Sequence, residues 1–322
     1  MDFRRYSRRR VCLGYGAGLG AVLALPGKVL SKRGDKPLVI TTLPQLAASL
    51  DALLNGACRL DALVPPQGDP HAYRLSRSDI AALDRASAVV SIGFGLEAAM
   101  APVLARLARD KPVIALADQL PRSSLRHFEG SAHREHGRDG SLAGIDPHIW
   151  LDPALWATAL AAAVGALHDK GIIGGAAAET NGYSGTLRDL AAAIQQRASA
   201  LPSERRVIVT AHDSLGYFGR RFGFDTYAAR GAGALGATGV KRIERLTDLV
   251  VERRVPVLFR EIGVNDQPLR SIRDAAARRG HRPRLSEPLR IATSNLAAAG
   301  GYVAMMKTLS EKIIGGLELG AQ

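Results

Sequence analysis

Short apolar runs alternate with amphipathic stretches along most of this chain. The runs occupy residues 37–42, 59–64, 88–92, 112–116, 206–210 and 255–259. Continuous apolar runs of this length, with helical patterns between them, are typical of parallel strands that are buried on both faces. The pattern therefore predicts an α/β fold with two lobes, each containing a parallel sheet.

A longer amphipathic segment separates the two groups of predicted strands. Residues 177–201 contain no proline, and apolar side chains recur there at helical spacing. These apolar positions are Leu187, Leu190, Ala191 and Ile194. One helix of this length would span roughly 35 Å and would act as a rigid strut. We therefore expect an N-terminal lobe at 32–176, a linking helix at 177–201 and a C-terminal lobe at 202–322.

Arginines crowd the N-terminus, ahead of an uncharged apolar segment. Five arginines lie between residues 4 and 10, and residues 11–26 carry no charge. This segment is shorter than the about 20 apolar residues that a membrane span needs. The pattern is typical of an export signal, which we place at residues 1–31. It predicts a periplasmic protein, exported by the twin-arginine or the general route.

The net charge of +13 does not indicate a nucleic-acid partner. Residues 1–31 carry six basic side chains and one acidic, so their removal leaves +8. The remaining arginines are scattered along predicted helices, and aromatic residues make up only 5% of the chain, which leaves few stacking platforms. Cys58 would be the one cysteine of the exported chain, so no intramolecular disulfide is expected.

Three histidines stand out as candidate metal ligands. The tripeptide Asp-Pro-His occurs twice, ending at His71 and at His148, and His212 lies between an alanine and an aspartate after a predicted strand. A neutral imidazole is a common metal ligand, and ligands of open α/β sheets bind at the carboxyl ends of strands. We predict that the three rings bind one ion, with neighbouring aspartates accepting their second ring N–H groups. The alternative is three unrelated loop residues or helix caps.

These motifs resemble those of the metal-binding solute receptors of bacterial ATP-driven importers, the zinc and manganese group. Residues 146–153 match the family's second ligand segment in full, and residues 69–79 resemble the first, with Leu75 and Arg77 where prolines are usual. Further similar segments are 210–218, 259–265 and 299–306. The resemblance covers essentially the whole exported chain. It implies two α/β lobes joined by a rigid helix, a metal ion between them, and delivery of that ion to a membrane permease.

One departure from the family bears on the choice of metal. Many members supply an aspartate as fourth ligand shortly before the last of these segments, but residues 291–296 contain no carboxylate. By the resemblance, the site holds three histidines with water, or recruits Glu261. Three imidazoles with a weak fourth ligand favour Zn²⁺ over Mn²⁺, which prefers more oxygen donors. Manganese receptors of the family often have glutamate where this chain has His212. We expect a monomeric Zn²⁺ receptor that is not an enzyme.

Two other functions remain open at this point. An exported zinc hydrolase would use the open coordination position to activate water, with Glu261 as its general base. A Mn²⁺-selective receptor of the same family is the second. His127, His133 and His136 lie where zinc receptors of the family often carry a His-rich loop, and both an auxiliary metal role and a plain solvated loop are open for them. Because free histidine titrates near ~6.5, metal affinity is expected to fall below about pH 6.

Overall fold

The computed structural model describes most of the chain beyond its N-terminal segment. The described residues are 36–66, 68–128, 144–174, 181–230, 239–291 and 301–319. The predicted export signal at 1–31 lies outside them, as do 292–296 of the stretch that lacks the family's carboxylate. Residues 36–322 form one compact unit. No helix in the described part of this unit is both long and apolar enough for a membrane crossing.

The N-terminal lobe contains a four-stranded parallel sheet. Its strand order is β2-β1-β3-β4. The strands are β1 (Leu38–Thr41), β2 (Arg59–Ala62), β3 (Ala88–Ser91) and β4 (Val113–Ala115), and the helices that connect them are α1 (Pro44–Leu54), α2 (Arg77–Arg85) and α3 (Ala101–Leu107). The inner strands β1 and β3 are buried throughout, as predicted. Edge strand β2 alternates between exposed and half-buried residues, so the expectation of burial on both faces is wrong there.

The C-terminal lobe contains two pairs of parallel strands, which meet between β5 and β7. A parallel bridge joins Thr210 to Phe259, so the order across the lobe is β6-β5-β7-β8. The strands are β5 (Val207–His212), β6 (Asp225–Arg230), β7 (Val257–Leu258) and β8 (Arg284–Leu285), and the helices are α6 (Gly216–Phe222), α7 (Val240–Glu252) and α8 (Gln267–Arg278). β5 continues to His212, so this histidine ends the strand rather than following it.

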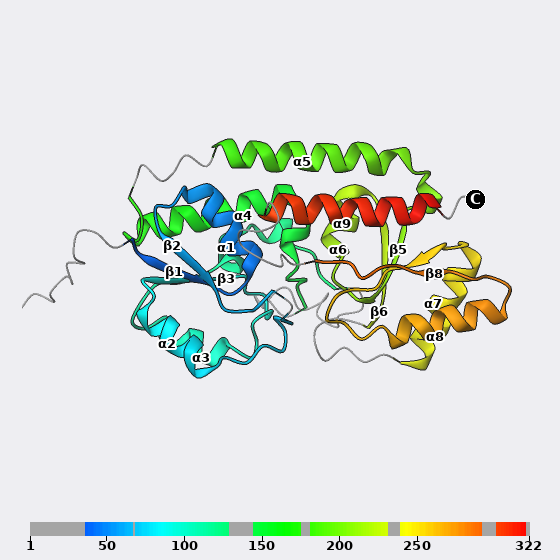
Figure 1. Cartoon of the computed structure of the whole chain (residues 1–322), viewed down its shortest axis with the longest axis horizontal. Helices are drawn as coiled ribbons and strands as arrows, with labels where there is room; N and C mark the ends of the chain where they lie inside the picture. The colour runs from blue at the N-terminus through cyan, green and yellow to red at the C-terminus, as the bar shows by residue number, and fades with distance from the viewer. Residues whose placement is uncertain are drawn as a thin grey trace, which may run out of the picture. The chain divides into compact units, whose positions relative to one another are not determined.

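Long helices extend along both groups of strands (Figure 1). Helix α5 (Asn181–Ala200) occupies the place of the predicted linking helix, and α4 (Pro153–Asp169) packs against it. Helix α9 (Gly301–Glu318), drawn in red beside α5, was not among the elements predicted from the sequence. Arg197 of α5 lies 4.0 Å from Glu311 of α9. The prediction had a single long helix at this place, whereas the structure has α5 and α9 side by side.

A continuous apolar core connects the two sheets. Buried side chains of β1 and β3 belong to the same cluster as Tyr217, Phe259 and the inner face of α9, including Met306. A second cluster fills the opposite face of the C-terminal sheet, where Leu246 of α7 and Ile272 of α8 pack on Val209. Because close-packed interiors resist deformation, a shared core supports the prediction of a stiff connection between the lobes.

Candidate metal centre

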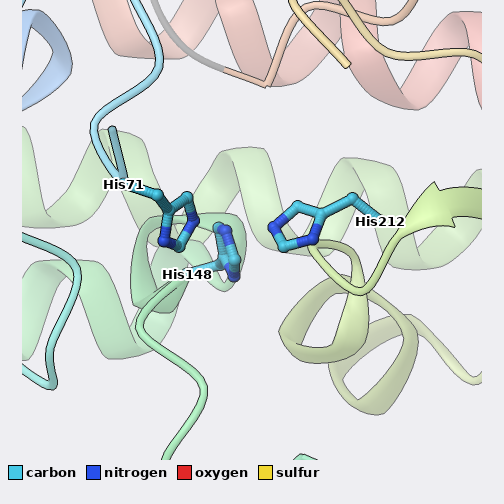
Figure 2. Close-up of side chains that lie close together, drawn as sticks. All are labelled: His71, His148 and His212. Carbon is cyan, nitrogen blue, oxygen red and sulfur yellow. The ribbon is translucent and has the colours of Figure 1, made fainter. Parts of the chain in front are cut away.

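The three predicted histidines converge on one point (Figure 2). The ring centroids lie 5.5 Å apart for His71 and His148, 5.3 Å for His71 and His212, and 5.2 Å for His148 and His212. One nitrogen of each ring lies within 4.8 Å of the others. Three nitrogens around one tetrahedral Zn²⁺ would be about 3.3 Å apart, so small side-chain adjustments suffice. The rings come from the loop after β2, from the segment before α4, and from the end of β5.

The repeated Asp-Pro-His tripeptide forms the same local turn twice. The Asp69 carboxylate accepts a hydrogen bond from the backbone N–H of His71 at 2.9 Å, and Asp146 accepts one from the N–H of His148 at 3.0 Å. An aspartate that accepts from the residue two positions later closes an Asx turn, and the intervening proline fixes the backbone between them. The tripeptide therefore fixes the backbone of a loop at the position that carries a histidine ring.

The two turns differ in what holds the ring. Asp146 Oδ1 lies 2.7 Å from Nδ1 of His148, as the sequence analysis predicted for a neighbouring aspartate. A carboxylate can only accept, so Nδ1 carries the proton and the lone pair is on Nε2. Asp69 bonds to the backbone of His71, and the buried Nε2 of that ring has no hydrogen-bond partner among the described residues.

Arg126 connects the segments that carry two of the histidines. Its guanidinium donates to Asp146 at 2.8 Å and lies 3.5 Å from Asp213, the residue after His212. Its backbone N–H donates to the Tyr217 hydroxyl at 3.0 Å. Burial raises the pKa of Asp146, and the charge of Arg126 opposes that rise. Arg126 therefore compensates the charge that orients the His148 ring.

Glu261 lies behind His212 rather than among the three rings. Its buried carboxylate accepts from the backbone N–H of His212 at 3.2 Å and from the hydroxyl of Ser214. The Thr210 hydroxyl donates to the carbonyl of His212 at 2.7 Å. Among the described residues, the group with ligand atoms close together comprises the three histidines without Glu261. In this structure Glu261 holds the backbone that presents the ring.

Burial makes the three imidazoles poor proton acceptors. Loss of hydration lowers the pKa of His71 to about 4, of His148 to about 3 and of His212 to about 2, and for His71 and His212 the neighbouring rings add to the effect. The rings are therefore neutral well below pH 6, which is the protonation state that a metal requires. The expectation that affinity falls below about pH 6 rested on ordinary histidine pKa values and moves to lower pH.

Unsatisfied polar atoms mark the centre of the cluster. Nε2 of His71 and both ring nitrogens of His212 are buried and have no hydrogen-bond partner among the described residues. Buried polar groups are nearly always paired, so such a concentration calls for a missing partner. A cation at the centre would take one lone pair from each ring. The donor set of three neutral nitrogens fits a borderline metal ion better than a hard one.

The histidines lie in the wall of a cavity of about 260 Å³. Its lining also includes Gln45, Asp69, Arg230 and Arg290. Gln45, Arg230 and Arg290 carry no recognisable signal in the sequence, because each is an ordinary polar residue within or beside a regular element. Only the tertiary structure brings them to the histidines.

Trp150 packs the second ligand segment. Its ring centroid is 5.2 Å from that of His148, and its indole N–H donates to the carbonyl of Ile291 at 2.7 Å. Trp156 is also buried and donates to the hydroxyl of Ser49 at 3.0 Å. Both indoles thus join distant segments around the site.

Of the three histidines for which an auxiliary metal role is open, the structure describes His127 alone. His127 forms an antiparallel bridge with Ile145 and has a buried ring nitrogen without a partner among the described residues. His133 and His136 lie outside the described residues. Their role stays a sequence-based question.

Two α/β lobes with three convergent imidazoles between their strand ends define a metal-binding solute receptor. The chain belongs to the family described as zinc-uptake complex component A, periplasmic (ZnuA), whose model matches residues 39–316. The chain is 30% identical to the zinc-binding protein TroA of Treponema pallidum over 281 residues, which cover 85% of this chain and 86% of TroA. It is 28% identical to the manganese-binding lipoprotein MntA of Bacillus subtilis, covering 82% and 85%.

The fold agrees with solved structures of such receptors. The structure of the periplasmic zinc-binding protein TroA from Treponema pallidum superimposes with a TM-score of 0.76 at 28% identity, covering 88% of this chain and 99% of TroA. The α/β fold and the family that the sequence motifs indicated are thereby confirmed. Members of this family are substrate-binding components of metal importers.

Proposed function

We propose that this chain is a periplasmic receptor that binds Zn²⁺ through His71, His148 and His212 and delivers it to an ABC-type permease in the inner membrane. The observation that carries the proposal is the set of three neutral imidazoles, two buried and one half-buried, with no carboxylate of the described residues among the mutually close ligand atoms. Nitrogen ligands suit Zn²⁺, whereas Mn²⁺ prefers oxygen. Relatives of this chain are named for zinc and for manganese, so the choice between the two metals rests on the donor set of this chain.

The position of Glu261 favours a receptor over a hydrolase. A general base must reach the metal-bound water, but both carboxylate oxygens of Glu261 are engaged, by Ser214 and by the backbone of His212. Burial raises its pKa to about 7. We therefore assign Glu261 the role of supporting His212, propose a site completed by water or another small ligand, and propose no catalytic activity.

Metal analysis of protein exported to the periplasm tests this function. The protein, a monomer in our proposal, should contain one Zn²⁺ per chain and should retain it against an equal concentration of Mn²⁺. Preferential retention of Mn²⁺ would support the manganese receptor instead. Turnover of ester or peptide substrates by the Zn²⁺-loaded protein, abolished in a Glu261→Gln variant, would support the hydrolase. N-terminal sequencing of the same sample would locate the cleavage site of the export signal.

A further inference from the structure

Two arginines give the cavity beside the histidines a positive charge. Arg230 ends β6 and pairs in register with His212 at the end of β5. Arg290 follows Leu289, whose backbone N–H donates to the carbonyl of Arg260 at 2.7 Å. Both arginines line the cavity, and among the described residues of its lining Asp69 is the one acidic side chain. With neutral histidines the lining carries a net positive charge even before a divalent cation binds.

These arginines have unused hydrogen-bond donors. Nε of Arg230 and one terminal nitrogen of Arg290 are buried without a hydrogen-bond partner among the described residues. Arg230 shares the lining of the cavity with His71 and His212. A buried guanidinium N–H without a partner is costly, and a metal ion in the same cavity adds to that cost.

A third polar group is aimed at the same space. Gln45 is fully buried, lines the cavity, and has both its amide nitrogen and its amide oxygen unpartnered among the described residues. It is the second residue of α1, which begins after Leu43 without a capping side chain. An uncapped helix N-terminus attracts negative charge, since its first N–H groups point outward along the helix dipole.

We infer that the cavity binds a small oxyanion together with the metal ion. One oxygen would take the coordination position that the three histidines leave open, and the remaining oxygens would accept hydrogen bonds from Arg230, Arg290 and Gln45. This inference rests on the proposed function and deepens it, because it supplies the fourth metal ligand from outside the chain. The guanidinium group of an arginine can donate two parallel hydrogen bonds to two oxygens of a carboxylate, carbonate or phosphate. The ligand class is therefore a small oxyanion of this kind.

Gln45 refines the chemistry of the anion. Its amide nitrogen donates, and its amide oxygen needs a donor in return. Bicarbonate and hydrogen phosphate carry an O–H that could supply that donor, whereas acetate has none. The preferred co-ligand is therefore an oxyanion that retains a proton, and acetate should bind more weakly than either.

Chelator-buffered Zn²⁺ titrations at constant pH and ionic strength test the inference. Zn²⁺ affinity is measured in sodium chloride and in sodium acetate, bicarbonate or phosphate. In bicarbonate or phosphate it should be about tenfold higher than in chloride, the effect of one charge-assisted hydrogen-bonded contact, with a smaller gain in acetate. The separate arms distinguish carbonate from phosphate as the source. By reciprocity, the affinity for ¹³C-labelled bicarbonate should rise by the same factor when Zn²⁺ is bound.

Matched variants locate the effect. In Arg230→Met and in Arg290→Met, the ratio of the Zn²⁺ affinity in oxyanion to that in chloride should fall from about tenfold to near one. Arg278→Met removes the same charge from the exposed end of α8 and should keep the full dependence. Arg230→Lys retains the charge and provides a second variant if Arg230→Met does not fold.

The outcomes separate the two proposals. Equal Zn²⁺ affinity of the wild-type protein in chloride and in all three oxyanions would overturn the co-ligand and leave the receptor function standing. An oxyanion effect that survives in both arginine variants would also overturn it. Failure to bind Zn²⁺ in any of the four salts would instead reject the proposed function.

Discussion

The two lobes have the same strand order but contribute differently to the site. The N-terminal order is β2-β1-β3-β4 and the C-terminal order is β6-β5-β7-β8. In both, the strand that comes second in the sequence of the lobe lies at the edge of the sheet, next to the strand that comes first. In each lobe the first strand carries a threonine whose hydroxyl donates to the carbonyl two residues later, Thr41 to Leu43 at 2.9 Å and Thr210 to His212 at 2.7 Å. Leu43 and His212 therefore occupy corresponding positions, and both line the cavity.

Each lobe also buries a glutamate against the end of a strand. Glu97 accepts from the Thr42 hydroxyl at 2.6 Å and from the backbone N–H groups of Ile92 and Gly93 at 2.8 and 3.0 Å. Glu261 has the corresponding role beside His212 and Ser214. At these corresponding strand ends the lobes differ in one side chain, which is leucine in the N-terminal lobe and histidine in the C-terminal lobe. The N-terminal lobe provides its two ligands from loops instead.

Removing ligands is expected to have the largest effect. His212→Ala takes away the single ligand of the C-terminal lobe, and His71→Ala or His148→Ala one of the two from the N-terminal lobe. Each should weaken Zn²⁺ binding by more than about 100-fold, the upper range for losing a residue that merely supports a ligand. Competition with a chromophoric chelator measures this. His168→Ala, at an exposed histidine, is the control and should bind as the wild type does. Normal affinity in any ligand variant would remove that residue from the site.

Substitution of Asp146, the polar partner of His148, is expected to have the next largest effect on Zn²⁺ affinity. Asp146→Asn keeps the shape of the side chain but weakens the bond to Nδ1 and the ion pair with Arg126. Zn²⁺ affinity should fall about 10–100-fold, as for other residues that orient a metal-bound histidine. Asp69→Asn should cost less, since Asp69 bonds to the backbone of His71. Equal losses in the two variants would show that the turns are equivalent after all.

The two corresponding glutamates, Glu97 and Glu261, should respond differently to substitution by glutamine. In Glu97→Gln the new amide NH₂ must face a backbone N–H on either side, so the variant should lose about 1–3 kcal/mol of unfolding free energy. In Glu261→Gln the NH₂ can face Ser214, whose hydroxyl can turn to accept, so the loss should stay below about 1 kcal/mol. Urea unfolding of the metal-free proteins measures both. A Zn²⁺ affinity reduced more than about 100-fold in Glu261→Gln would mean that Glu261 is itself a ligand.

The last expected change is the effect of pH on Zn²⁺ affinity between about 5 and 7. The pKa values of the three rings are lowered to about 4 or less, so protons compete with the metal for the rings only below that pH. Burial raises the pKa of Asp146 to about 7, so its carboxyl group is protonated within this range. The affinity should fall at most about 50-fold, the limit for one titrating group, whereas three histidines of ordinary pKa would lose roughly 10⁴-fold. Titrations at pH 5, 6 and 7 decide between these values. A steep decline would show that the rings are hydrated before the metal binds.

The sequence predicted best those features that depend on neighbouring residues. The apolar runs at β1, β3 and β5 are continuous because inner strands are buried on both faces, and each was identified from this pattern. The same pattern cannot detect β6, whose residues Asp225–Arg230 are mostly exposed or half-buried. The repeated Asp-Pro-His tripeptide was recognisable because the Asx turn needs its aspartate two residues before the ring.

Features that depend on distant segments were not accessible to the sequence. Arg126 lies 20 residues before Asp146, and nothing around it indicates an ion pair with that residue. Gln45 occupies the first turn of a helix, where a polar residue usually faces water, yet it is fully buried. Glu261 was placed near the site by resemblance, but its contacts with His212 and Ser214 depend on how β5 and β7 meet.

Arg126 also bears on how long a bound ion stays. Its guanidinium occupies the space that a Cβ at Gly216 would fill, and there it touches the aspartate beside His148 and the one beside His212. Outward movement of the segment that carries His148, or of the segment that carries His212, therefore breaks one of two ion pairs. Each ion pair adds to the barrier that a bound ion must cross to leave, so we expect the loss of either one to shorten the residence time of the ion.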